Sequence, residues 1–320
     1  MRLDGAAAAF GRHESFPLRY GWIAKGLRAL VDDAGIFTRD DATITLGVGK
    51  NMVSAIRHWL FATRIVERDD RGGLVVSPVG EIVFPKDDDG GDPYLEDEAT
   101  IWLLHWLMAT NPSGATAIYW FFNHFHKTEF DSGEVAATLA DFVRQNVKTR
   151  VAASTLKNDA TLLLRMYAPA REGRNLAVED MLNSPLAVLH LLDRIDTRTW
   201  RAFPTARDEL PLDVFAFAVA ELFAHLGTQQ LSVAQLMYSE RDHCAPGAVF
   251  RMTEEGLVQK VEALCAAFPN ALRVDRTAGL YQLYRIGAID AGSILRDRYA
   301  APAVRDGRDA PTAYANGVAA

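Results

Sequence analysis

Residues 45–60 read TLGVGKNMVSAIRHWL, a glycine-bounded turn that leads into a helix with two unlike faces. One face is apolar, and its residues recur every three or four positions, as in a helix that packs on a core. The opposite face is basic and polar, and it consists of Lys50, Asn51, Ser54, Arg57 and His58. The stretch therefore predicts an amphipathic helix whose polar face is free to bind a ligand.

The residues on either side of this helix complete a familiar order. A short helix is predicted over residues 40–44, and residues 65–68 and 74–76 read as two strands around the turn sequence DDRGG. Helix, turn, helix and hairpin in this order outline a winged helix-turn-helix, in which the second helix enters the major groove of double-stranded DNA. The hairpin would then hold phosphates through Arg64, Arg68 and Arg71. A winged helix that docks only on protein is the alternative.

Composition limits where such binding could occur. The chain has 320 residues, of which 49% are hydrophobic and 23% charged, as in an ordinary soluble globular protein of two or three domains. Its net charge of −7 argues against nucleic-acid binding by the whole surface, so any DNA contact must be regional. The two cysteines match no metal motif, residues 101–125 are too interrupted by polar residues for a membrane span, and no signal peptide is recognisable. We expect a cytoplasmic protein without membrane association.

The chain in order predicts a mainly α fold with an N-terminal winged helix-turn-helix, a central helical bundle and a C-terminal winged-helix-like module. We expect a DNA-binding domain over residues 1–86, a helical domain over 87–206, a winged-helix-like domain over 207–300 and a disordered tail over 301–320. The C-terminal module rests on a helix over 253–268 followed by strands over 272–274 and 280–284. That helix is acidic, so we expect it to pack against protein. The other predicted helices cover residues 22–33, 100–109, 115–127, 133–146, 154–167, 176–192, 211–226 and 229–239, and residues 199–210 are expected to be irregular.

The most reactive-looking segment precedes the first helix. Within residues 10–22, FGRHESFPLRYGW, a base, a phosphate clamp and a hydroxyl could come from Arg12, His13, Glu14, Arg19 and Tyr20. The alternative is structural: the two arginines pair with Glu14 or cap carbonyl groups, while the aromatic residues pack. The familiar phosphate loops, serine-hydrolase elbows and zinc-protease motifs are missing from the sequence.

Further clusters give weaker signals. His124 and His126 point about 200° apart on a helix, so with His105 they cannot share one ion, and we assign no metal site. The acidic run over residues 87–98 lacks a calcium-loop spacing, and the adjacent pair His243 and Cys244 is a weak catalytic signal. A second basic and amide cluster is either a binding surface or a solvated helix face; it contains Lys148, Arg150, Lys157, Asn158 and Arg165.

Several segments resemble an uncharacterised bacterial family of unknown function. They are FGRHESFPLRYGW (10–22), LGVGKNMVSAIRHWL (46–60), STLKNDATLLLRMY (154–167), NSPLAVL (183–189) and PGAVFRM (246–252). Genes of that family stand beside sulfurtransferases in islands that modify DNA with phosphorothioate or defend against phage. The resemblance implies a DNA-facing subunit of such a system, and in single-strand systems the nickase, with sulfurtransferase or ATPase subunits as partners. It brings no residue-level catalytic pattern, and the cofactor is unknown; a divalent cation is the candidate if the chain is a nickase.

Two readings other than a nickase remain open from the sequence. A transcriptional regulator would use the same winged helix without catalytic activity. An assembly adaptor would dock a sulfurtransferase or ATPase through the acidic C-terminal module.

Overall fold

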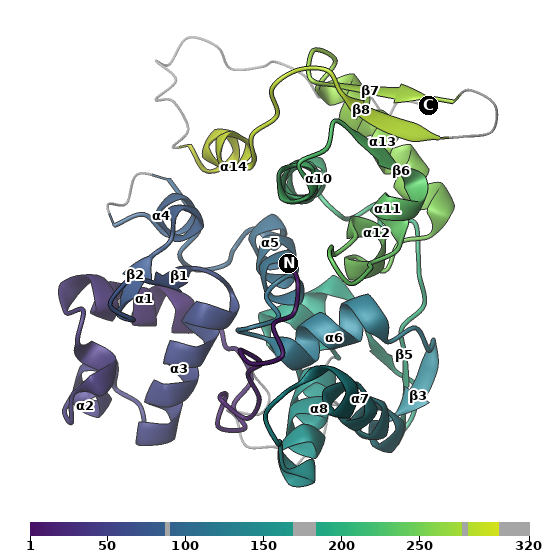
Figure 1. The fold of residues 1–320 in the computed structure, drawn as a ribbon. Helices are drawn as coiled ribbons and strands as arrows, with labels where there is room; N and C mark the ends of the chain where they lie inside the picture. Colours follow the sequence, from purple (N-terminus) through teal and green to yellow (C-terminus); the bar gives the residue numbers. More distant parts are fainter. Residues whose placement is uncertain (87–89, 169–183, 277–280, 301–320) are drawn as a thin grey trace, which may run out of the picture.

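In the computed structural model, helices of the N-terminal part pack around the helix that residues 50–60 begin (Figure 1). The structure describes residues 1–86, 90–168, 184–276 and 281–300. Helix α3 (Lys50–Ala62) buries its apolar face against α1 (Trp22–Asp32), and Gly26 of α1 allows this close approach because a Cβ there would lie 2.4 Å from Ile56. The short α2 (Ala42–Leu46) ends at Gly47, whose φ of 60° is in the left-handed region that favours glycine. A 3-10 turn (Ile36–Thr38) lies between α1 and α2.

An antiparallel hairpin follows α3. Strand β1 (Val66–Arg68) pairs with β2 (Leu74–Val76), with Val66 opposite Val76. Helix α4 (Pro78–Val83) comes next, capped by the Ser77 side chain, which accepts the Gly80 N–H. Thus α1, α2, α3, β1 and β2 follow one another as the sequence predicts.

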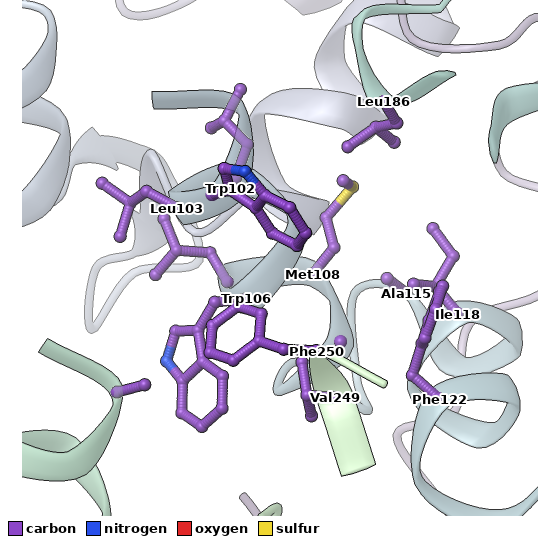
Figure 2. Close-up of a cluster of buried hydrophobic side chains, with 14 of the residues drawn as sticks. Trp102, Leu103, Trp106, Met108, Ala115, Ile118, Phe122, Leu186, Val249 and Phe250 are labelled. Carbon is purple, nitrogen blue, oxygen red and sulfur yellow. The ribbon is translucent and has the colours of Figure 1, made fainter. Parts of the chain in front are cut away.

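The middle of the chain is built on a helix that is buried on every side. This is α5 (Glu98–Ala109), and α6 (Thr116–His124), α7 (Ser132–Asn146) and α8 (Ala153–Tyr167) follow it. Figure 2 shows its side chains inside a cluster that also includes residues of α6 and of the C-terminal part. Trp106 of α5 stacks on Phe250 with ring centroids 5.5 Å apart. The hydrophobic core is therefore continuous between the middle and the C-terminal part.

The middle part also contains a small sheet made from distant segments. Its strand order is β3 (Glu129–Asp131), β5 (Thr199–Arg201), β4 (Asp193–Arg194), all antiparallel. The sheet corrects the expectation that residues 199–210 are irregular throughout, because β5 needs β3 as its partner and local sequence does not reveal it. Before it, residues 185–189 form a 3-10 helix (Pro185–Leu189) that ends at His190 with φ of 46°. The predicted helix over 176–192 is therefore wrong over residues 184–192, and its residues 176–183 lie outside the described chain.

The C-terminal part alternates helices with a three-stranded sheet. Helix α10 (Leu212–Leu226) precedes β6 (Gln230–Ser232), and α11 (Val233–Met237), α12 (Pro246–Val249) and α13 (Glu254–Ala267) precede β7 (Leu272–Asp275) and β8 (Gln282–Arg285). The strand order is β6-β8-β7. Residues 229–239 are thus a strand and a short helix instead of one helix, because β8 offers β6 an edge to pair with.

The last described helix packs against elements from the first third of the chain as well as against α10. Helix α14 (Ala291–Tyr299) packs against α10 and α4, and the Tyr299 hydroxyl lies 2.8 Å from Thr100 Oγ1 of α5. The fold is mainly helical with small antiparallel sheets, as the sequence predicts. In the described ranges no helix is both long and apolar enough to cross a membrane. The predicted tail over 301–320 lies outside these ranges, and the predicted domain boundaries stay predictions.

Candidate functional site

One face of α3 is exposed, basic and polar. The side chains of Lys50, Asn51, Ser54 and Arg57 are exposed, whereas Ile56 and its neighbours on the opposite face are buried. The periodicity of the sequence causes this division, since residues three or four positions apart share a face of a helix. Four of the five residues of the predicted polar face therefore lie at the surface.

The fifth residue of that set, His58, is placed differently. Its ring is half-buried against Trp59, with centroids 4.8 Å apart, and 6.1 Å from the ring of His13. Burial lowers the pKa of His58 to about 3, and the nearby His13 and Arg12 add to this shift. His58 is consequently neutral at pH 7 and lines a cavity instead of the exposed face of α3.

The β1–β2 hairpin beside α3 carries two further exposed arginines. Arg71 is at its tip, and Arg68 lies over the Phe61 ring, with 5.2 Å between the guanidinium carbon and the ring centroid. The carboxylate of Asp69 accepts the backbone N–H groups of Arg71 and Gly73 and so fixes the turn. Both arginines remain placed to contact a ligand lying along α3.

Arg64 departs from the expectation for the hairpin. Its guanidinium forms two hydrogen bonds with the carboxylate of Glu221 in α10, at 3.1 and 2.6 Å. The same carboxylate accepts the indole N–H of Trp106 at 2.7 Å. The structure therefore replaces the predicted phosphate contact of Arg64 with an ion pair to Glu221. This pair links the residues just after α3 to α10 in the C-terminal part.

The N-terminal segment meets α3 and α8 at a buried histidine–aspartate pair. Nε2 of His13 lies 2.8 Å from Asp159 of α8, and Nδ1 of His13 accepts the backbone N–H of Ser15 at 3.1 Å. Because Nδ1 is an acceptor, Nε2 carries the ring proton and donates a hydrogen bond to Asp159. The Gly11 N–H donates to both carboxylate oxygens of Asp159 at 3.1 Å. Both ring nitrogens of His13 are thus engaged, and the ring positions the segment.

A small cavity opens beside this pair. Its volume is about 30 Å³, and its lining includes Arg12, His13, His58, Thr116 and Asp159. Sequence reasoning missed Asp159 and Thr116. A signal for Asp159 was present, because it is a lone carboxylate on the apolar face of the predicted helix, and a buried charge requires a partner.

The other predicted catalytic residues do not line that cavity. Glu14 is exposed, and the guanidinium of Arg19 lies over the rings of Phe16 and Trp22, at 5.9 and 5.3 Å from their centroids. Tyr20 is also exposed, and partial burial followed by the charge of Glu98 raises its pKa. Of the five, the structure brings only Arg12 and His13 together at the cavity.

His105 and Cys244 have ordinary packing roles. His105 is fully buried between the Tyr167 hydroxyl and the Val249 carbonyl, at 2.9 Å from each, and burial lowers its pKa to about 3. Burial raises the pKa of Cys244 to about 12, so this thiol is a poor nucleophile. In the parts of the chain that the structure describes, the donor atoms of Glu240, Asp242 and His243 lie within 4.8 Å of one another.

Comparison with known proteins gives one family and two solved structures. Residues 10–299 match the family described as "Protein of unknown function (DUF4007)". The chain is similar to "Magnesium ion-bound SspB crystal structure", with 26% identity, a TM-score of 0.80 and coverage of 91% of this chain and 88% of that one. It is also similar to "SspB crystal structure", with 27% identity, a TM-score of 0.79 and the same coverage. No curated protein matches.

Proposed function

The chain belongs to the family of unknown function DUF4007, and we propose that it is a DNA-binding component of a DNA phosphorothioate-modification or phage-defence system acting in the cytoplasm. The observation that carries the proposal is the exposed face of α3, with its four basic and polar side chains, beside a hairpin with two exposed arginines. The phosphorothioation context comes from the family resemblance of the sequence and agrees with the two SspB structures among its neighbours.

We assign the N-terminal part as a winged helix-turn-helix, with α3 as the helix that enters the major groove. Lys50, Asn51, Ser54 and Arg57 would contact base edges and adjacent phosphates, while Arg68 and Arg71 of the hairpin would hold the backbone. Support comes from the order α1, α2, α3, β1, β2 and from the packing of both shorter helices on α3. His58 and Arg64 are left out of this contact set because both are engaged inside the protein.

The C-terminal part would serve a protein partner. Its order of α10, β6, α11, α13, β7 and β8 supports a second winged-helix-like module. Helix α13 precedes the strands β7 and β8 as α3 precedes β1 and β2. Its residues Glu254 and Glu255 are exposed and acidic. Acidic side chains repel DNA phosphates, so a sulfurtransferase or ATPase subunit with a basic surface is the partner that this helix suits.

Nicking is the more demanding part of the proposal. A general base works best when its pKa is near the working pH, whereas the pKa of His58 is about 3. His13 has no free ring nitrogen, and Asp159 already accepts three hydrogen bonds. The geometry beside α3 therefore favours holding DNA over cutting it, and this observation supports the non-catalytic regulator as the second candidate function.

One of the similar structures is described as magnesium-bound. In this chain, the group formed by Glu240, Asp242 and His243 is poorly suited to magnesium. Magnesium prefers oxygen ligands in octahedral geometry, and Glu240 and Asp242 could supply two. The third member is an imidazole, and Nδ1 of His243 lies 3.1 Å from the Asp242 carboxylate, so the two side chains satisfy each other. We therefore derive no catalytic step from this group.

DNA binding is tested by titrating fluorescent duplex DNA with the full chain at low salt. The double variant K50A/R57A should bind at least about tenfold more weakly than wild type, because it loses two groups that contact DNA. The matched control R241A/R273A removes two exposed arginines from the C-terminal part and should bind as wild type does. Equal affinity of K50A/R57A and wild type would overturn the assignment of α3.

Nicking is tested with supercoiled plasmid and Mg²⁺ or Mn²⁺. Conversion to open circles by wild type, reduced in R12A and in H58A, would support a nickase centred on the cavity. Tight binding to one DNA sequence without strand breaks at any protein concentration would instead favour the regulator. Absence of DNA affinity together with capture of neighbouring gene products would favour the adaptor.

A further inference from the structure

A second exposed basic surface lies at the start of α8. Lys148 and Arg150 are in the loop between α7 and α8, and Lys157 is in the second turn of α8; all three side chains are exposed. Residues 142–167 contain five basic residues and a single acid, Asp159, in a chain whose net charge is −7. We call Lys148, Arg150 and Lys157 the α8 strip.

The α8 strip has no acidic partner among the residues that the structure describes. Asp159 is 4% exposed and accepts hydrogen bonds from His13 and Gly11, and the acid of α7 that is nearest in sequence, Asp141, pairs with Arg144 at 2.8 Å. Three like charges on consecutive turns and loop positions repel one another, so they favour an anionic ligand. A solvated helix face would explain exposure, but its charges are usually of mixed sign.

The N-terminal segment connects the α8 strip to α3. The backbone N–H of Lys148 donates to Gly5 O at 2.9 Å, and Gly11 lies so close to α8 that a Cβ on it would be 2.9 Å from Thr155. His13 then reaches α3, where its ring stacks on Trp59 at 6.3 Å. Figure 1 shows the starts of α3 and α8 at the same lower edge of the molecule, with the N-terminal segment between them.

Exposed basic groups are therefore present on both helices at this edge and on the segment between them. Lys50 and Arg57 belong to α3, Arg12 to the segment between the helices, and the α8 strip to the far side. Glu14 is the exposed acid of the intervening turn. A rigid DNA backbone that leaves α3 along this edge would meet Arg12 and then the α8 strip.

We propose that the α8 strip binds the phosphate backbone of the same DNA duplex that α3 contacts, beyond the groove that α3 enters. This inference rests on the proposed function, since it requires that α3 holds DNA. The ligand class is duplex DNA read through its charge and not its sequence, because lysine and arginine at the backbone carry no base information.

The test compares two duplexes, one separated strand of the longer duplex and two triple variants of the full chain. One duplex has about 10 base pairs, one helical turn, and the other about 30, long enough to extend past α3. The variant K148A/R150A/K157A removes the α8 strip. The control R241A/R273A/R296A removes three exposed arginines from the C-terminal part. Thermal melting of both variants establishes that they fold.

On the longer duplex, the strip variant should bind at least about tenfold more weakly at low salt, and the slope of log K against log salt should fall by about 2 to 3 units, close to 0.9 per lost phosphate contact. On the shorter duplex, it should bind as the control does. Affinity and slope equal to those of the control on both duplexes would overturn the inference. An effect confined to single-stranded DNA would overturn its commitment to duplex.

Failure of the proposed function gives a different result. If wild type has no affinity for either duplex, or if K50A/R57A binds like wild type, α3 is not a DNA-binding helix and both ideas fall. If K50A/R57A binds weakly while the strip variant matches its control, α3 still holds DNA and only the role of the α8 strip is lost.

Discussion

Nε2 of His13 lies 2.8 Å from the carboxylate of Asp159, although the two residues are 146 positions apart. The bond fastens the N-terminal segment to α8, and from the same segment Phe16 O accepts the indole N–H of Trp59 in α3 at 3.1 Å. The segment therefore bridges α3 and α8. A buried polar pair of this kind adds little net stability while intact, but removing one partner leaves the other unsatisfied.

Asp159→Asn should loosen this bridge. The amide cannot accept the Gly11 and His13 N–H groups as the carboxylate does, so the free energy of unfolding should fall by about 2–3 kcal/mol. Urea denaturation measures the change. Asp141→Asn, an exposed carboxylate on α7, is the matched control and should cost less than about 0.5 kcal/mol. Equal losses in the two variants would mean that the His13–Asp159 contact is not structural.

Arg64→Ala should destabilise the protein without a specific effect on DNA. In this variant Glu221 loses two of its three hydrogen bonds and keeps the one from Trp106. We expect the free energy of unfolding to fall by about 2 kcal/mol. A double-mutant cycle with Glu221→Ala should give a coupling of about 1–2 kcal/mol. Negligible coupling, together with weaker DNA binding, would restore Arg64 as a phosphate contact.

Arg68→Ala and Arg71→Ala should show the opposite behaviour. Neither arginine forms an ion pair with another described residue, so we expect stability within about 0.5 kcal/mol of wild type. Each should reduce the salt slope of duplex binding by about 1 unit if it contacts a phosphate. Arg241→Ala, on the C-terminal part, serves as the control. Slopes unchanged from wild type would remove the hairpin from the interface.

Stability should fall as the pH is lowered below 6.5. His105 has a pKa of about 3 in the folded chain against 6.5 in an exposed histidine, so between these values the unfolded chain binds a proton that the folded chain does not. Its contribution is present above pH 6.5 and is lost at about 1.4 kcal/mol per pH unit as the pH falls toward 3. The half-buried His58 adds a loss of the same sign.

The variant His105→Phe tests this contribution. Its unfolding free energy, measured by urea denaturation between pH 6 and pH 4, should have a pH slope shallower than that of wild type by about 1.4 kcal/mol per unit. Tyr167→Phe removes the hydroxyl that donates to His105 but keeps the ring buried, so it should lose about 1 kcal/mol and retain the wild-type slope. A wild-type slope in His105→Phe would show that His105 can be protonated without unfolding.

Helices were predictable from the sequence where the apolar pattern and the capping residues agree. The helices expected over 133–146, 154–167 and 253–268 match α7, α8 and α13 to within one residue at each end. Strand β6 was mistaken for helix because its partner β8 is about 50 residues away, and short strands have little local signal without a neighbour. The 3-10 helix at Pro185 was likewise hidden by an apolar run that suits a longer helix.

The candidate site was predictable only in part. Periodicity placed Lys50, Asn51, Ser54 and Arg57 on one exposed face, since helical geometry alone determines which side chains share a face. It misplaced His58 at the edge of that face, because burial there depends on the N-terminal segment that covers it. The residue types of segment 10–22 predicted one reactive cluster, whereas the turn of the chain separates its members, which are Arg12, His13, Glu14, Arg19 and Tyr20.

By itself, the sequence determined the amphipathic α3, the hairpin after it and the largely helical character of the chain, because these depend on residues within one or two turns of each other. Only the tertiary structure decided that His13 pairs with Asp159, that Arg64 pairs with Glu221, and that the start of α8 lies at the same edge as the start of α3. The two side-chain pairs join residues more than 140 positions apart, and their partners are selected by how the whole core packs and not by any local pattern.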